Sequence, residues 1–412
     1  MLVALAVFSL VFLTAMFRHP DGIGCGLQFG GDYLLFHSSG RMILSGHARE
    51  LYDLKALKEI QLELFKAPLS NCLGADVPVA YLPVFLLPYT ILSLLSPFSG
   101  FLVSTAVTVG IFALAFWRLA RVVDKPAWVL WLFGLGSFAI LLGINYGQVH
   151  GWLFLAMTEF YIALRRQHDK RAGLWLALLV VKPQFLPLFV LFLLWQRRWR
   201  ALGSFLVASC SFFVGSVSIV GWWGFQKYVG YLVNDVAPMN ASGIGVGLMV
   251  NWRGFVLNWL AVNSDTNMAM VTALLSLLTI AGLVPWLLRS WQQTSQERLP
   301  LVLLGLASAA LLVGYDTGLH SAVLVLPPGL QVASDLTKQG ANTRLAGPWV
   351  LDLILLVPSL AFMANLLVYR DPWLSWVTAN QVMILGMVAA LVWIAIGSIK
   401  EMSPTLQSAT VS

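Results

Sequence analysis

The sequence predicts an all-α polytopic membrane protein, built as a bundle of about 12 transmembrane helices. Two observations predict this fold class. Of the 412 residues, 59% are hydrophobic and only 10% are charged, whereas a soluble domain has about 25% charged residues. The hydrophobic residues also gather in runs of about 20, which is the length of a helix that crosses a hydrocarbon core about 30 Å thick. We therefore expect a single transmembrane domain over residues 1–412.

The basic residues stand in short clusters between the apolar runs, and the formal net charge is +7. Lys and Arg concentrate in the cytoplasmic loops of membrane proteins. The clusters therefore predict how the helices are oriented, and they do not indicate a nucleic-acid partner. On this rule the cytoplasmic clusters are 118–125, 165–171, 197–200, 289–298 and 338–344. We expect a multi-pass protein of the cell (inner) membrane.

The N-terminal part of the chain contains one predicted span and one long external loop. Residues 2–17 are apolar and are expected to stay as the first span, and the loop follows over 18–98 with juxtamembrane helices. Over 51–64, Leu and Ile recur at helical spacing with Lys and Glu on the other side, which predicts an amphipathic helix on the membrane surface. Residues 78–95 contain several prolines and too few apolar residues for a span, so we expect an interfacial or re-entrant segment.

Most later apolar runs predict simple helices, whereas 173–195 does not. This segment has basic clusters on both sides and Lys182-Pro183 in its middle. Proline breaks the hydrogen-bond ladder of a helix, and broken helices are tolerated in membrane proteins where they line a cavity. We therefore expect two short helices that meet at Lys182. The other helices are expected over 100–117, 127–144, 151–164, 201–220, 268–288, 299–314, 319–332, 349–368 and 377–396, with a second large external loop over 221–266.

The three cysteines leave two alternatives open. Cys25 and Cys72 flank one polar loop, so they either form a disulfide in an oxidising compartment or stay as free thiols. Cys210 lies in an apolar run.

The most informative polar stretch is Gly30-Gly31-Asp32-Tyr33, in the first external loop near the lipid boundary. A carboxylate at this place can accept a proton from a hydroxyl group and act as a general base. Alternatively, Asp32 only caps a helix that begins near Tyr33, since Asp is a favoured N-cap residue. Metal-ligand spacings, phosphate-binding glycine loops and nucleophile elbows do not occur in the sequence. We therefore expect neither a metal nor a cofactor.

Several short motifs, in their order along the chain, resemble glycosyltransferase family 87. The resemblance rests on Gly31-Asp32-Tyr33, Gly46 followed by Leu51-Tyr52-Asp53, Tyr81-Leu82-Pro83, Gly147-Gln148, Val181-Lys182-Pro183 and Tyr315-Asp316. Members of this family are polyprenyl-phosphate-sugar-dependent enzymes with the C-type glycosyltransferase fold. The sequence departs from the family pattern after Asp53, which lacks a following aromatic residue, and at Val149, where the family often has Asn.

The resemblance implies that Asp32 matches the catalytic aspartate of the family and that the reaction is a single inverting displacement. Asp32 would take the proton of an acceptor hydroxyl, which attacks the anomeric carbon opposite the leaving polyprenyl phosphate. Phosphate is a good leaving group, so the second carboxylic acid of the glycoside hydrolases is not needed. The expected partners are a polyprenyl-phosphate sugar (mannose by resemblance), an envelope lipid or glycan as acceptor, and membrane lipids. The active site is expected on the periplasmic or extracytoplasmic side.

Charge that grows on the departing phosphate needs fixed donors in a low-dielectric site. Lys182 is the first candidate, because an ionisable residue inside the membrane is costly and is a functional hypothesis by default. The alternative is a lysine whose ammonium reaches an interface. His150, Arg41 and Arg49 are the further candidates for the donor phosphate, and each is otherwise an ordinary interfacial side chain.

Four polar residues are assigned to the sugar or the acceptor. Asn145 and Gln148 lie on a tight external turn, and their amide groups both donate and accept hydrogen bonds. Asp316 is a second external carboxylate, expected to bind the acceptor or to orient a donor such as His320. Glu159 lies about two turns before the cluster at 165–171, so we expect it to form an ion pair there.

A polytopic lipid or solute transporter, or a flippase, is the alternative class. Such a protein would have paired repeats and a midplane site formed by matching broken helices, but only Lys182-Pro183 offers such a break. A structural subunit of an envelope-assembly complex would leave Asp32, Lys182 and Asp316 without a joint purpose. We therefore predict a glycosyltransferase in which the Asp32 loop, the 145–150 turn, Lys182 and Asp316 converge on one outer cavity.

Overall fold

The computed structural model describes residues 30–65, 79–236, 249–259, 265–291, 296, 298–315, 317–338, 354, 357–361 and 372–400. Within these ranges the chain is helical and has no strand, apart from an isolated antiparallel bridge between Met249 and Gly318. Cys210 is a free, exposed thiol. The predicted first span, Cys25, Cys72 and most of the helix expected over 349–368 lie outside the described residues.

Four helices in this part of the chain are long and apolar enough to cross a membrane. They correspond to α6 (Pro97–Val123), α12 (Trp199–Tyr231) with the next three residues, and parts of α14 (Asp265–Trp291) and α19 (Pro372–Lys400). The pair α7 (Ala127–Gly136) and α8 (Phe138–Tyr146), which bends by 71° at the break between its helices, would make a fifth span. An all-helical membrane architecture is thus confirmed, and the number of about 12 spans remains a prediction.

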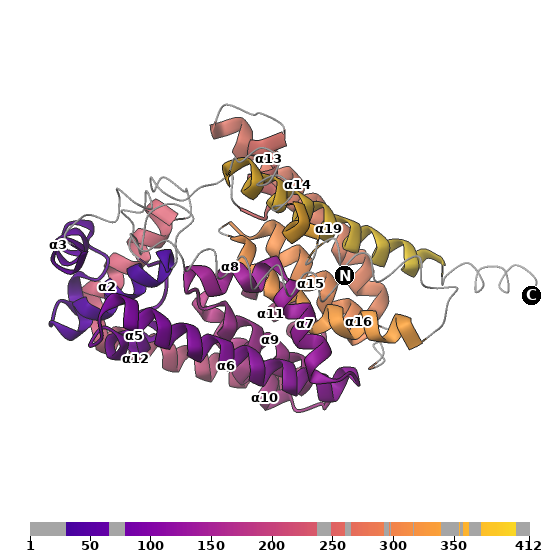
Figure 1. Ribbon diagram of the computed structural model, residues 1–412. Helices are drawn as coiled ribbons and strands as arrows, with labels where there is room; N and C mark the ends of the chain where they lie inside the picture. The colour runs from indigo at the N-terminus through magenta and orange to yellow at the C-terminus, as the bar shows by residue number, and fades with distance from the viewer. Residues whose placement is uncertain are drawn as a thin grey trace, which may run out of the picture.

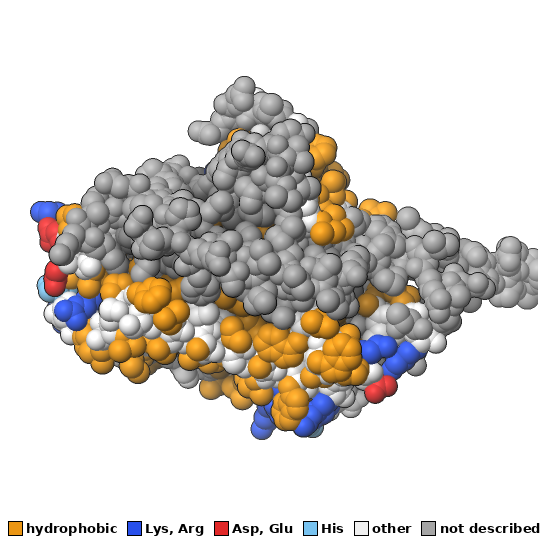
Figure 2. Space-filling view, in the orientation of Figure 1, with side chains coloured by type: hydrophobic (Ala, Val, Ile, Leu, Met, Phe, Trp, Pro, Cys, Tyr) orange, Lys and Arg blue, Asp and Glu red, His pale blue; other side chains and the backbone are white. Residues whose placement is uncertain are grey.

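Two ends of the molecule differ in charge. The C-terminus of α6 and the N-terminus of α12 lie at one end, which carries the basic residues 118–125, 165–171 and 197–200 and is called the basic end below. Short helices occupy the opposite end, as Figure 1 shows on its left side: α2 (Gly31–Leu44), α3 (Leu54–Phe65) and α5 (Leu87–Leu92). In the coloured part of Figure 2, hydrophobic side chains cover much of the surface between charged groups at both ends.

The segment 83–92 is shorter than a membrane span. The 3-10 helix η2 (Pro83–Leu86) and α5 together have only the length of a short apolar helix. α5 packs on α2 so closely that a Cβ at Gly40 would lie 2.3 Å from the carbonyl oxygen of Tyr89. The amphipathic helix α3 begins at Leu54 and not at 51, because Asp53 Oδ1 accepts the backbone N–H of Lys55 at 3.0 Å.

Lys182 lies at the tip of a helical hairpin, as predicted. The chain leaves the basic end through α10 (Asp169–Ala177) and η3 (Leu178–Val181), and it returns through η4 (Pro183–Phe185) and α11 (Leu186–Trp195). Arg198 Nη1 donates to Asp169 Oδ1 at 2.8 Å, which ties the two open ends of the hairpin together. With about 1.5 Å per α-helical and about 2 Å per 3-10 residue, the outgoing arm carries Lys182 about 20 Å from the basic end.

α10 packs closely on α12. A Cβ at Gly173 would lie 1.9 Å from the carbonyl oxygen of Ala201, so only glycine permits this contact.

Three predicted boundaries were wrong. The helix expected over 127–144 breaks at Ser137, where the backbone is extended after two glycines. The loop expected from 221 is helical to Tyr231 with a kink at Gly221, because aromatic residues at helical spacing pack there, and η5 (Leu232–Val236) and α13 (Trp252–Trp259) follow. The run over 319–332 divides into η7 (Leu319–Val325) and α16 (Leu326–Lys338), whereas α9 (His150–Arg165) and α15 (Leu299–Val313) form as expected.

Candidate functional site

Asp32 lies in the first turn of α2. This end of the helix contacts the turn between α8 and α9. The helix begins at Gly31, and Gly30, with a φ of 75°, is its N-cap residue. The backbone N–H of Gly30 donates to the carbonyl oxygen of Asn145 at 2.7 Å. Asp32 is therefore not the cap, so the capping alternative is wrong. A helix N-terminus stabilises a nearby negative charge, and the partly buried carboxylate stands in that field.

Gln148 connects Asp32 to a second element. Its Nε2 donates to Asp32 Oδ2, and its Oε1 accepts the hydroxyl hydrogen of Tyr81 at 2.8 Å. Gly147 brings the turn against α2: its φ is 69°, and a Cβ there would lie 2.6 Å from the Cβ of Tyr33. Both ends of the Gln148 amide thus contact protein groups, whereas the sequence assigned this amide to the sugar.

Lys182 is held out of helical geometry by the proline that follows it. Its φ and ψ are −131° and 78°, outside the helical range, and Pro183 begins η4. A residue before proline is disfavoured in the helical region by steric clash. The side chain is 4% exposed, and Nζ lies 2.9 Å from His320 Nε2.

His150 and His320 connect Lys182 to the Asp32 turn. Nδ1 of His150 lies 3.0 Å from the carbonyl oxygen of Gln148, so this nitrogen is the donor of the bond. The two imidazole rings contact edge to face with centroids 6.3 Å apart. Asp32, Gln148, His150, His320 and Lys182 therefore form one continuous series of contacts, called the polar chain below. It runs from α2 through the α8–α9 turn and η7 to the tip of the hairpin.

The other predicted residues have different outcomes. Asn145 is fully buried, and among the described residues its amide nitrogen and oxygen have no hydrogen-bond partner. Asp316 lies outside the described residues. Arg41 lies at the other end of α2, about 14 Å along the helix from Asp32, and Arg49 is exposed in η1 (Ala48–Glu50) beyond it. The structure does not bring these two arginines to the polar chain.

Two residues that the sequence did not single out also shape the site. Tyr81 belongs to a motif of the family resemblance, but no role was assigned to it. Asn251 is buried, and its Nδ2 donates to the carbonyl oxygen of Gly314 at 2.7 Å. It thereby holds the turn that precedes His320. No pattern in the sequence indicates this contact, since the two segments are 63 residues apart.

Tyrosine side chains lie near enough to Asp32 to feel its charge. Burial raises the pKa of Tyr89 on α5, and the neighbouring Tyr33 and the charge of Asp32 raise it further. The phenol of Tyr89 therefore stays neutral at physiological pH. Among the described residues, no group of three His, Cys, Asp or Glu side chains could hold a metal ion.

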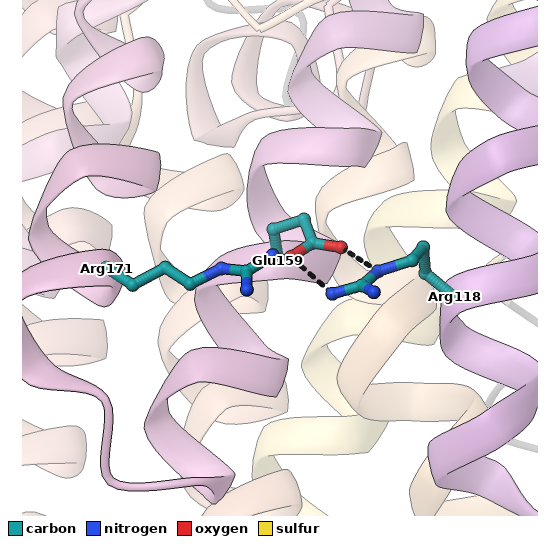
Figure 3. Close-up of polar contacts among 3 residues, drawn as sticks. All are labelled: Arg118, Glu159 and Arg171. Atoms are coloured by element: carbon teal, nitrogen blue, oxygen red, sulfur yellow. Dashed lines mark hydrogen bonds and ion pairs between the residues drawn. The ribbon is translucent and has the colours of Figure 1, made fainter.

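Glu159 forms an ion cluster nearer the basic end with one expected partner, Arg171, and one further partner, Arg118 (Figure 3). Both of its carboxylate oxygens accept hydrogen bonds from Arg118 of α6, and Oε2 also accepts one from Arg171 of α10 at 2.6 Å. Arg165, at the end of the same helix, donates to the hydroxyl of Tyr161 instead. The expected pairing with the cluster at 165–171 is thus right for Arg171, and Arg118 was missed because it comes from another helix.

Comparison with known protein families gives one match, and comparison with curated proteins gives none. The model of Glycosyltransferase family 87 matches residues 80–315, which is more than half of the chain. Tyr81, Gln148, His150 and Lys182 lie within the matched range, and Asp32 and His320 lie outside it.

Proposed function

Because the chain belongs to glycosyltransferase family 87 and is a membrane glycosyltransferase, we propose that it transfers a sugar from a polyprenyl-phosphate carrier to a hydroxyl group of an envelope lipid or glycan. The observation that carries the proposal is the polar chain. It joins a carboxylate from α2 and an ammonium from the hairpin tip by one series of contacts, of which one step uses the main-chain carbonyl of Gln148. A base for the acceptor and a cation for the phosphate are the two groups that this reaction needs.

In the proposed reaction, Asp32 removes the hydroxyl proton of the acceptor as its oxygen attacks the anomeric carbon of the sugar. The bond between this carbon and the phosphate oxygen breaks, and its electron pair stays on the phosphate. The products are the glycosylated acceptor, with inverted anomeric configuration, and polyprenyl phosphate. Asp32 then gives up its proton to solvent, which restores the base.

Lys182 would meet the departing phosphate. An ammonium group has three donors, so it can bind a phosphate oxygen and keep its contact with His320 Nε2. A charge pair of this kind is strong in a buried site, where the effective dielectric constant is far below that of water. His320, whose Nε2 accepts from the ammonium, would add its Nδ1–H as a donor. As a neutral imidazole, His150 gives its one ring proton to the carbonyl oxygen of Gln148, so it would support His320 and not donate to the phosphate. Mannose is the proposed sugar.

Asn145 is proposed to bind a sugar hydroxyl, because its buried amide has no partner among the described residues. Burying an amide without hydrogen bonds costs free energy, and a substrate hydroxyl would remove that cost. Asp316 is proposed to bind the acceptor. The reaction is proposed to occur on the extracytoplasmic side, because the basic end is expected in the cytoplasm and Lys182 lies about 20 Å from it.

The test is sugar transfer by the purified full-length protein in lipid, with radiolabelled polyprenyl-phosphate mannose and a lipid extract of the host envelope as acceptor source. We expect Asp32→Asn to lower the rate at least about 10²-fold, because it removes the general base. Asp53→Asn is the matched control: Asp53 is a carboxylate in the same region whose Oδ2 pairs with Lys227 at 3.3 Å, and Asn keeps its capping role.

Equal transfer by the wild type and Asp32→Asn would remove Asp32 from catalysis. The proposed donor class would be contradicted if even the wild type transferred no sugar, either from this donor or from other labelled polyprenyl-phosphate sugars.

A further inference from the structure

We propose that Tyr81 is a positioning residue that orients Asp32 through Gln148 and sets its strength as a base. This inference rests on the proposed function, in which Asp32 takes the proton of the acceptor. The hydroxyl of Tyr81 donates to Gln148 Oε1 at 2.8 Å, and Gln148 Nε2 donates to Asp32 Oδ2.

The donor and acceptor chemistry allows only this orientation of the Gln148 amide. An ionised carboxylate can only accept hydrogen bonds, so Gln148 must present its NH₂ group to Asp32. Its oxygen then points away from Asp32 and meets the hydroxyl of Tyr81. Since Gln148 is only 8% exposed, water has little access to replace the phenol. Tyr81 therefore keeps the amide turned toward the carboxylate.

The position of Tyr81 is itself determined by its neighbours. Its ring stacks on Phe36, with centroids 5.4 Å apart and an interplanar angle of 26°. Phe36 lies four residues after Asp32 on α2, and residues at this spacing share one face of a helix. In addition, the hydroxyl of Tyr52 donates to the backbone oxygen of Tyr81 at 2.6 Å. The phenol thus reaches the Asp32 site from a ring that packs on the same helix.

The hydrogen bond to Asp32 Oδ2 comes from an uncharged group, the amide of Gln148. The titratable groups on the surrounding elements include Tyr89 on α5, Tyr146 on α8, His150 on α9, and His37 and Arg41 on α2 itself. His37 is bonded to the carbonyl oxygen of Leu95, His150 to that of Gln148, and Arg41 lies more than two turns along the helix from Asp32. The Gln148 amide is the group that donates to Asp32 Oδ2.

Two effects follow when the hydroxyl of Tyr81 is removed. The amide of Gln148 loses the partner that orients it, so Asp32 is held less firmly and the rate of proton removal falls. A hydrogen bond to the ionised form of a carboxyl group lowers its pKa, so a weaker bond from Gln148 raises the pKa of Asp32. The binding of the polyprenyl phosphate at Lys182 is unaffected, because the two ends of the polar chain are separated by both histidines.

The experiment compares Tyr81→Phe with Tyr161→Phe in the full-length protein in lipid; Tyr161 is a buried tyrosine of α9 whose hydroxyl accepts from Arg165 near the basic end. Each variant removes one buried phenol hydroxyl and keeps the ring, but only Tyr81 contacts Gln148. For Tyr81→Phe we expect a fall in kcat of about threefold to tenfold, an unchanged KM for the donor, and an acid limb of the kcat/KM profile at higher pH. For Tyr161→Phe we expect the wild-type pH profile, whatever the change in thermal stability.

A second readout does not depend on activity. The infrared difference spectrum between wild type and Asp32→Asn, recorded over a range of pH, follows the protonation of the Asp32 carboxyl group. In the Tyr81→Phe background this titration should move to higher pH. Gln148→Met removes the amide itself and should give the same direction of shift, so it serves as a second variant if Tyr81→Phe folds poorly.

The inference would be overturned if Tyr81→Phe and Gln148→Met both gave the same pH profile and the same infrared titration as the wild type. If Asp32→Asn still loses transfer in that case, only the positioning role is wrong and the proposed function stands. If Asp32→Asn keeps transfer, the assignment of the base itself is wrong.

Discussion

Neutralising Glu159 should destabilise the protein far more than neutralising an exposed carboxylate at the same end of the molecule. The side chain of Glu159 is 3% exposed and pairs with Arg118 and Arg171. The cluster joins α6, α9 and α10, and α10 leads to the hairpin that carries Lys182. Glu159→Gln keeps the shape of the side chain and removes its charge, so it tests the ion pairs and not the packing.

The expected magnitude follows from burial. Breaking a buried ion pair by removing one partner costs about 3–5 kcal/mol, because the other charge stays buried without compensation. The side chains of Arg118 and Arg171 are 22% and 47% exposed, so both can recover part of their hydration. We therefore expect a loss of about 2–3 kcal/mol. The control is Asp124→Asn: Asp124 and its partner Lys338 are 86% and 52% exposed, and such pairs contribute up to about 1 kcal/mol.

The assay is thermal unfolding of the purified variants in one detergent, with tryptophan fluorescence as the signal. Asn also suits the left-handed backbone of Asp124, whose φ is 57°, so the control adds no strain. Raising the salt concentration should reduce the small effect of Asp124→Asn more than that of Glu159→Gln, since exposed charges are screened more strongly. Equal shifts in the melting temperature for the two variants would refute the reasoning.

Three further predictions concern the site and its support. Lys182→Gln should lower kcat about 10²-fold to 10³-fold by removing a donor to the phosphate, which steady-state kinetics would show; wild-type kcat would contradict this role. Hydrogen bonds from the backbone N–H of Ala56 and, to a smaller extent, from Lys227 lower the pKa of Asp53 in the folded protein. The ionised Asp53 therefore stabilises the fold above its ordinary pKa of 3.8. This contribution disappears as the pH falls through the lower pKa of the folded state. Melting temperatures of wild type and Asp53→Asn should therefore differ at neutral pH and converge in acid, and a constant gap would count against it. Gly173→Ala should destabilise strongly because its Cβ meets backbone, whereas Gly203→Ala, with nothing within 4 Å, should be neutral or slightly stabilising; matching melting temperatures would contradict the close packing.

The hairpin at Lys182 shows how much of the fold could be predicted. Basic clusters on both sides of one apolar segment are incompatible with a simple span, and the proline explains where the chain turns. The short helices within residues 78–95 follow in the same way from length and proline content, and an interfacial or re-entrant position of this segment stays a prediction. Helix ends were less predictable. The helix that continues to Tyr231 depends on packing of Phe225 and Tyr228, which cannot be read from a glycine-rich sequence.

The site was predictable as a set of residue types and not as a set of contacts. Asp32 and Lys182 stand out because charged groups are costly near lipid. The sequence assigned Gln148 to the sugar, whereas the structure places its amide between Asp32 and Tyr81. Arg41 and Asp32 belong to one predicted stretch, yet the helix between them carries the guanidinium about 14 Å away.

The membrane class and the broken helix at Lys182 followed from composition and charge pattern. Both properties can be read from one segment without knowing which other segment it contacts. Hydrophobicity and the positions of Lys, Arg and Pro act locally along the chain, so the sequence alone expresses them. Only the tertiary structure decided which polar groups meet, because Asp32 and Gln148 are 116 residues apart and Lys182 and His320 are 138 residues apart. Such contacts depend on how whole helices pack, and that packing rests on side-chain shape over many residues, which no local pattern contains.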